Sequence, residues 1–227
     1  MLLNNFALLL SDPWVFLTLL SAVISALVLG ITVHEFSHAF VAHKLGDDTA
    51  ARMGRLSLNP RSHLDPLGSI MILVAGFGWG KPVPVNPYRI RQGRVGMALV
   101  SLAGPLSNIL LAALFSLPFQ LGLLAVPPGW FSSEFQLSYL VAHIAQMTVL
   151  LNVVLAVFNL LPLAPLDGAS VVLGLAPKRF IPVLYRLQMA GPALLIGIIF
   201  FDLFLNVGIL WRITGPVVDW LVVRLMS

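Results

Sequence analysis

Four long runs of apolar residues, with few polar interruptions, set the architecture that this sequence predicts. They cover residues 14–33, with helix expected to continue to Ala42, and residues 95–117, 135–166 and 187–210. A helix needs about 20 apolar residues to cross the hydrocarbon core of a bilayer, and each run is long enough. His143 interrupts the third run, and Asp202 lies inside the fourth. The pattern therefore predicts a chain that crosses a membrane several times.

Three shorter segments complete the pattern. Residues 66–79 are apolar but too short to cross, and they end in a glycine-rich stretch that disfavours further helix. Residues 213–223 fit an interfacial helix or half of a helical hairpin, so crossing by residues 206–226 is left open. Three prolines exclude helix and central strand from residues 81–91, which fit an edge strand, a hairpin arm or an ordinary surface loop. We expect an all-α polytopic membrane protein of about five to six transmembrane or re-entrant helices, with a short β-hairpin-like re-entrant segment near residues 81–91.

Composition supports membrane residence independently of any motif. Hydrophobic residues make up 59% of the chain and charged residues only 10%, whereas a soluble domain carries about 25% charged residues. The chain has no cysteine, which excludes disulfides and cysteine-ligated metals. Its net charge of +4 comes without a basic and aromatic face, so we expect no nucleic-acid partner.

The placement of basic residues predicts the orientation in the bilayer. Eleven of the thirteen Lys and Arg residues fall in three connections, residues 44–65, 80–94 and 162–186. Connections rich in Lys and Arg stay on the cytosolic side. The N-terminus is then extracytosolic, and the first long helix runs inward. Because both flanks of residues 66–79 are basic, that segment should dip into the membrane and return, or lie along it, shielded from lipid by neighbouring helices.

The strongest chemical signal is His34-Glu35-Phe36-Ser37-His38. Residues four apart on a helix lie about 40° apart around its axis, so both imidazoles can reach one metal ion. Glu35 lies beside them and can act as the general base toward a metal-activated water. A solvated helix face does not explain the motif, because these residues end an apolar span where an unpaired carboxylate is costly. We expect one Zn²⁺ per chain.

A catalytic zinc site takes three protein ligands and keeps one position open. His43 is nine positions from His34, which places it about 180° around the helix, so it is rejected. His63 lies in a basic connection. His143 lies near the outer end of its span, at a different depth from His34.

Asp167 is the preferred third ligand. It follows a long helix that runs inward and that Pro162 and Pro165 should end. Asp167 then lies near the cytosolic side, at the depth where the first helix places His34 and His38. A helix cap or turn residue beside Gly168 is the alternative for Asp167 taken alone.

The other polar residues inside the spans can each be interpreted in two ways. Asn159 could hold a substrate carbonyl or stabilise an oxyanion, or it could bond between helices. For Asn108, within the small-residue stretch Gly104-Pro105-Leu106-Ser107-Asn108, helix packing is favoured over a substrate role. Asp202 fits a buried polar contact or a proton path.

These motifs resemble the site-2 protease family, in its compact bacterial and archaeal branch without PDZ or CBS domains. The resemblance covers roughly residues 20–175. Beyond the His-Glu-x-x-His motif it rests on Gly-Pro-x-x-Asn at 104–108, on Asn-x-x-Pro-x-x-Pro-x-Asp-Gly at 159–168, and on residues 54–60, 65–68 and 81–87. It implies an intramembrane zinc metalloprotease in which His34, His38 and Asp167 bind zinc and Glu35 is the catalytic base.

On this reading the chain is one membrane-embedded peptidase domain, residues 1–227, with a core at about 14–175 and C-terminal helices at about 183–226. The substrate is a membrane protein with a transmembrane helix, in a bilayer that we expect to be a prokaryotic plasma membrane. Peptidases bind extended segments, so Val83 and Val85 are candidates for pairing with substrate. A metal-ion transporter and a non-catalytic metal-binding membrane protein are the alternatives, although Glu35 and the scarcity of other polar groups in the spans disfavour them. Homo-oligomerisation is left open.

Overall fold

The computed structural model describes residues 6–75, 78–127, 137–205 and 207–227, and within these ranges the chain is helical without any strand. In chain order the elements are α1 (Phe6–Ser11), α2 (Pro13–Lys44), α3 (Thr49–Arg52), η2 (Pro60–Ser62), α4 (Pro66–Ala75), α5 (Gly93–Gln120), α6 (Leu137–Asn159), α7 (Asp167–Leu175), η3 (Lys178–Phe180), α8 (Ile181–Leu205) and α9 (Ile209–Met226). Four of the described helices, α2, α5, α6 and α8, are long and apolar enough to cross a membrane.

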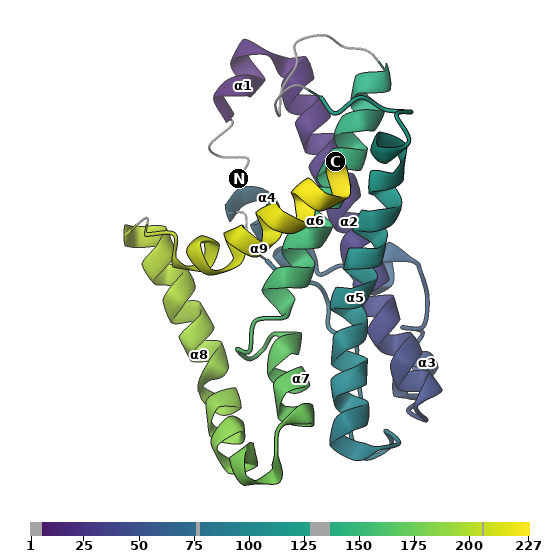
Figure 1. Cartoon of the computed structure of the whole chain (residues 1–227), viewed down its shortest axis with the longest axis vertical. Coiled ribbons are helices and arrows are strands. Elements are labelled where there is room, and N and C mark those ends of the chain that lie inside the picture. Colours follow the sequence, from purple (N-terminus) through teal and green to yellow (C-terminus); the bar gives the residue numbers. More distant parts are fainter. Residues whose placement is uncertain (1–5, 76–77, 128–136, 206) are drawn as a thin grey trace.

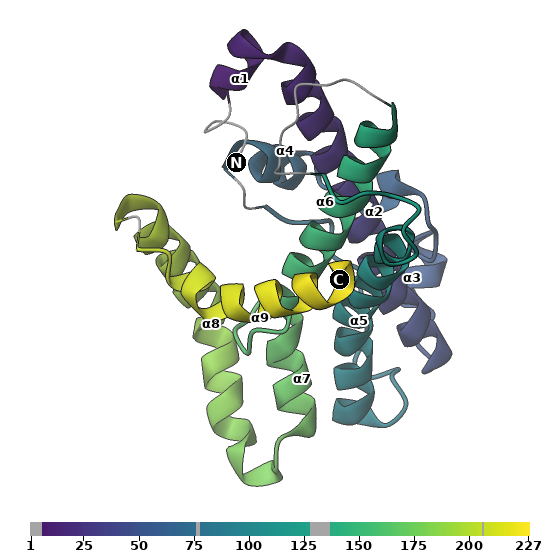
Figure 2. The ribbon, with the colours of Figure 1, turned by 45° about the horizontal axis from the view of Figure 1, so that its top comes forward.

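Helices α2, α5 and α6 form the central bundle, and each packs against the other two (Figure 1). Helix α7 packs against α5. Helix α8 stands apart from the bundle and contacts α7 and α9, while α9 crosses over α6 (Figure 2). The centre of the molecule is therefore the place where α2, α5 and α6 meet.

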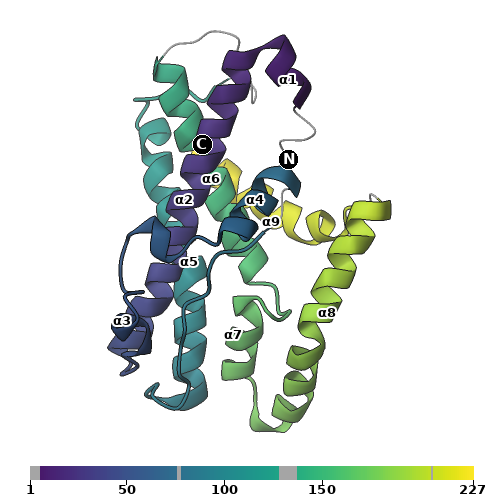
Figure 3. The ribbon, with the colours of Figure 1, turned by 180° about the vertical axis from the view of Figure 1, so that it is seen from behind.

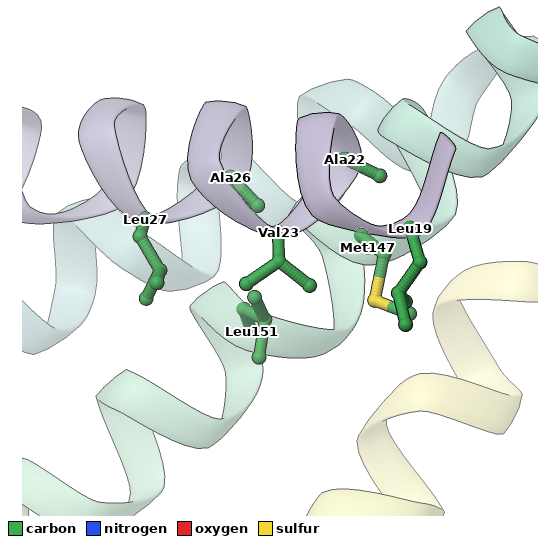
Figure 4. Close-up of a cluster of buried hydrophobic side chains, with 7 residues drawn as sticks. All are labelled: Leu19, Ala22, Val23, Ala26, Leu27, Met147 and Leu151. Carbon is green, nitrogen blue, oxygen red and sulfur yellow. The ribbon is translucent and has the colours of Figure 1, made fainter. Parts of the chain in front are cut away.

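Small residues allow α2 and α6 to approach closely. Ala22 and Ala26 are fully buried, and Gly30 continues the same spacing of four residues. Such a small-residue stripe lets membrane helices approach through van der Waals packing. Figure 4 shows the resulting cluster, which Leu19, Ala22, Val23, Ala26 and Leu27 of α2 form with Met147 and Leu151 of α6.

The four predicted apolar helices are confirmed as α2, α5, α6 and α8. Helix α6 ends at Asn159, before the proline at 162, as a proline-terminated helix should. Residues 66–75 form the short helix α4, and residues 209–226 form α9. Residues 76, 77, 135, 136 and 206, which belong to three of the predicted segments, lie outside the described residues.

The hairpin-like segment expected near residues 81–91 differs from the structure. Residues 81–86 form neither helix nor strand, and the one bridge between extended residues, Leu64 with Gly80, precedes them among the described residues. The physical reason is the loss of donors, because proline has no N–H for a β-ladder. The segment is held instead by bonds from other parts of the chain.

Candidate metal centre

Three side chains from two helices converge at the centre of the bundle. His34 and His38 come from α2, and Asp167 is the first residue of α7. The Nε2 atoms of the two histidines are 3.0 Å apart. Asp167 Oδ2 lies 3.1 Å from Nε2 of His34 and 3.3 Å from Nε2 of His38. Both histidines are 8% exposed, so the cluster is well covered by protein.

The other ring nitrogen of each histidine fixes its tautomer. His34 Nδ1 lies 2.6 Å from Asn108 Oδ1, and His38 Nδ1 lies 2.7 Å from the Val100 carbonyl oxygen. Both partners are oxygens that only accept, so each Nδ1 carries the proton and donates it. In the neutral rings Nε2 is then unprotonated, with its lone pair directed at the cluster.

The geometry and the donor types both fit zinc. The cluster brings together two imidazole lone pairs and a carboxylate oxygen, which favours a cation between them. Ligand atoms at about 2.0–2.1 Å from a tetrahedral zinc lie roughly 3.3 Å from one another, close to the separations of 3.0–3.3 Å seen here. Within the described residues this is the one such group of His, Asp or Glu side chains.

Helix α5 packs closely against the two histidine rings. A Cβ at position 104 would lie 2.5 Å from His38 Nε2 and 2.6 Å from His34 Nε2, so only glycine leaves room for the rings. One turn further, Asn108 holds His34. The Gly-Pro-x-x-Asn stretch is therefore more than a packing motif, although the sequence pattern favoured packing for Asn108.

Glu35 lies on the same helix and its carboxylate is held by a backbone amide. The Val83 N–H donates to Glu35 Oε2 at 3.0 Å. The segment that carries Val83 is tied on both sides: Lys81 N–H donates to the His63 carbonyl at 2.7 Å, and Asn86 N–H donates to Asp47 Oδ2 at 2.6 Å. Arg55 also donates to the Lys81 carbonyl. Sequence reasoning missed Asp47 and Arg55.

A cavity of about 320 Å³ opens beside His34 and Glu35. It lies between α2, α6, the segment after α4, and α8, whose positions Figure 3 shows. Its walls are mainly apolar and are formed by Ile31, His34, Glu35, Gly78, Trp79, Gly80, Pro82, Leu155, Phe158, Asn159, Pro165, Leu166 and Leu195.

The three histidines that were not selected as metal ligands in the sequence analysis lie outside the cluster. His43 is bonded to Asp48 at 2.7 Å, His63 to the Ser57 carbonyl at 2.6 Å and His143 to the Tyr139 carbonyl at 2.7 Å. Asp202 accepts from the N–H groups of Ile209 and Leu210 at 2.6 and 2.9 Å. It therefore caps the start of α9, which accounts for this charge inside an apolar helix.

The remaining candidates occupy different surroundings. Asn159 lines the cavity and donates Nδ2 to the Leu155 carbonyl at 2.9 Å. The Val83 N–H donates to Glu35, whereas the Val85 side chain packs against a cluster of Ala42, Ile90 and Val100. Asn152, which the sequence analysis did not select, bonds to Asn108. An amide inside an apolar run was the available signal, since such a group needs a hydrogen-bond partner.

Comparisons with known proteins identify the family. Residues 121–200 match the model of Peptidase family M50. YwhC of Bacillus subtilis (strain 168) is 42% identical over 171 residues, which are 71% of this chain and 72% of that protein. Rip2 of Mycobacterium tuberculosis (strain ATCC 35801 / TMC 107 / Erdman) is 32% identical over 182 residues, 74% of this chain and 65% of that protein. Rip2 of Mycolicibacterium smegmatis is 32% identical over 152 residues, 64% of this chain and 54% of that protein.

These relatives carry a provisional assignment as zinc metalloproteases. No solved structure matches the chain. The chain belongs to peptidase family M50, the site-2 protease family, and is a zinc metalloprotease of the intramembrane type. The predicted family, enzyme class and metal are confirmed, and the transporter alternative is not favoured.

Proposed function

We propose that His34, His38 and Asp167 bind one zinc ion per chain. Glu35 is then the catalytic base for hydrolysis of a peptide bond in a membrane-protein segment that is held in the adjacent cavity. The observation that supports this most is the convergence of three electron-pair donors within 3.0–3.3 Å, beside a carboxylate that lines the same cavity. His34, His38 and Asp167 would supply the three protein ligands that a catalytic zinc site uses.

The chemistry divides between the metal and the chain. Zinc, when bound, lowers the pKa of water and polarises the scissile carbonyl. Glu35 takes a proton from the attacking water and delivers it to the amide nitrogen as the C–N bond breaks. The bond from the Val83 N–H holds the carboxylate in place beside the cavity. Asn159, on the cavity wall, is our candidate for holding the substrate carbonyl or the oxyanion.

The substrate helix must unwind to reach the site, because a helical carbonyl is already hydrogen-bonded. The extended substrate would lie along residues 82–85. Pro82 and Pro84 lack N–H groups and the Val83 N–H is bonded to Glu35. Backbone pairing with substrate would therefore depend on the carbonyl oxygens of this segment, which accept from substrate N–H groups, and on the N–H of Val85. The apolar cavity walls suit the side chains of a transmembrane segment.

We propose that the site lies toward the cytosolic side of the membrane and that the N-terminus is extracytosolic. Residues 14–175 would form the membrane-embedded core of a single domain. The support is the position of the basic connections. Helix α3, the start of α5 and the turn from α7 to α8 lie at the same end of the molecule (Figure 1), and the basic connections lie around them.

The test uses purified protein in proteoliposomes with a panel of single-span membrane proteins. Glu35→Gln should keep zinc and lose cleavage by several orders of magnitude, because water activation and leaving-group protonation both depend on it. Asp167→Asn should lose most of its zinc, while Asp48→Asn, a matched change at an aspartate outside the cluster, should keep both zinc and cleavage. Cleavage by Glu35→Gln, or full zinc in Asp167→Asn, would overturn the assignment.

A further inference from the structure

Two amide side chains lie fully buried where α2, α5 and α6 meet. Asn108 comes from α5 and Asn152 from α6, and both are 0% exposed. Asn108 Nδ2 donates to Asn152 Oδ1 at 2.7 Å and to the Gly30 carbonyl at 3.1 Å. Asn152 Nδ2 donates in turn to the Thr148 carbonyl at 2.8 Å. A Cβ at position 30 would lie 2.8 Å from Asn152 Oδ1, so the close packing of α2 and α6 encloses this pair.

The bonds form a chain with one direction. The His34 Nδ1–H donates to Asn108, Asn108 donates to Asn152, and Asn152 donates to the Thr148 carbonyl. An amide has one oxygen and one NH₂ group, so turning one amide reverses what its neighbour meets. If Asn152 were reversed, its NH₂ would face the NH₂ of Asn108 and its oxygen would face the Thr148 carbonyl. Both contacts would be repulsive, and neither buried amide is exposed to solvent.

We infer that Asn152 is a positioning residue for the zinc site, acting through Asn108 on His34. By accepting from Asn108 Nδ2, Asn152 keeps the Asn108 oxygen turned toward His34. That oxygen holds the proton on Nδ1 and leaves the Nε2 lone pair for the metal. Groups that orient a metal-binding histidine through its other nitrogen commonly change metal affinity about 10–100-fold when they are removed.

A bond between two membrane helices could also serve packing alone. The two roles differ in what they change. A packing bond affects stability and leaves the zinc affinity of the folded protein unaltered, whereas a positioning bond changes affinity even where the variant is stably folded. The inference rests on the proposed zinc ligands, and the measurement must separate it from them.

The experiment measures the zinc dissociation constant of the purified full chain in detergent, by competition with a chelator, together with the absorption spectrum of the Co²⁺-loaded protein. Asn152→Leu should weaken zinc binding at least tenfold and alter the Co²⁺ spectrum. Asn152→Asp should stay within about threefold of wild type. Its carboxyl group has nearly the same shape as the amide and keeps an oxygen that accepts from Asn108 Nδ2, which is the bond that the inference requires.

Asn159→Leu is the matched control for zinc affinity. Asn159 lies on the same helix and makes the same bond to the carbonyl four residues before it, without contact to Asn108. Asn108→Leu should weaken zinc binding at least as much as Asn152→Leu, and the double variant should bind no more weakly than Asn108→Leu alone, since both act through one bond.

Three results would overturn the inference: wild-type affinity in Asn152→Leu, additive losses in the double variant, or an equal loss in Asn159→Leu. If Asn152→Leu does not fold, two other variants still test the inference. It requires Asn152→Asp to bind zinc like wild type and Asn108→Leu to bind zinc weakly. A wild-type chain without zinc affinity would contradict the proposed metal site instead, so the two failures are distinguishable.

Discussion

The spacing of His34 and His38 brings two imidazoles to one side of a helix, but it does not decide which nitrogen of each ring faces the metal. That choice is made by Asn108 and the Val100 carbonyl, which lie 74 and 62 residues further along the chain. The candidate ligands could therefore be predicted from local periodicity, together with the depth at which Asp167 should lie. Their hydrogen-bond partners could not, because those depend on how three helices pack.

Glycine at 104 gives the first prediction at this scale. Gly104→Ala should lower zinc affinity at least tenfold, because the new Cβ would lie 2.5–2.6 Å from the Nε2 atoms of His34 and His38 and close-packed interiors resist added volume. The rings cannot easily move aside, since Asn108 and Val100 hold their other nitrogens. Zinc content by mass spectrometry after dialysis against a weak chelator provides the measurement.

Gly197→Ala is the control for Gly104→Ala. It makes the same change in α8, at a position where a Cβ meets nothing within 4 Å. Alanine is ordinarily the better helix former, so this variant should keep its zinc and lose no stability. Full zinc in Gly104→Ala would show that the histidines can shift and still bind.

At the scale of elements, the four long helices followed from their apolar length, whereas α7 did not. Its sequence contains glycines at 168 and 174 and adjacent valines at 171 and 172, which weaken helix propensity. The helix forms because it packs on α5: a Cβ at position 174 would lie 2.4 Å from the Ala98 Cβ, and Arg94 donates to the Leu173 carbonyl at 3.0 Å. This packing places Asp167 at the cluster, so tertiary contact overrides local preference.

The segment around Val83 is held by Asp47, a titratable side chain that accepts a hydrogen bond from the Asn86 N–H. Burial alone would raise the pKa of Asp47, yet hydrogen bonds from Thr49 and from the Asn86 N–H lower it. The folded pKa is thus below the value of about 3.9 for an unfolded chain. The stabilisation is fully present above that value and is lost as pH falls through the folded pKa.

Asp47→Asn should therefore have a lower melting temperature than wild type at pH 6, because one amide oxygen cannot accept all three bonds. The difference should shrink as pH falls below about 4, where wild type loses the ionised carboxylate. Thermal melts of the purified protein between pH 3 and 7 measure this. Asp48→Asn, at the neighbouring half-exposed aspartate, should show much less of it. A constant gap between Asp47→Asn and wild type at every pH would contradict the titration.

At the scale of the molecule, α8 stands apart from the bundle yet closes one side of the cavity. Leu195 lines the cavity and is 4% exposed, while the next residue, Ile196, is 58% exposed. Leu195→Trp should occupy part of the 320 Å³ and reduce cleavage at least tenfold, mainly through KM, with zinc affinity unchanged. Ile196→Trp, on the outer face, should cleave normally. Equal effects of both changes would indicate that α8 acts through the fold and not through the cavity.

The absence of cysteine makes the proposed orientation directly measurable. The Tyr88→Cys change falls in a basic connection at a side chain that is 99% exposed, and Leu123→Cys falls just beyond the end of α5 at one that is 73% exposed. Helix α5 runs the length of the bundle between them (Figure 1), so the two thiols should face opposite sides of the bilayer. In intact cells a membrane-impermeant maleimide should label Leu123→Cys, and should label Tyr88→Cys only after permeabilisation. The unmodified chain is the blank. The reverse pattern would place Glu35 near the extracytosolic side, and the substrate segments that the enzyme can cut would change with it.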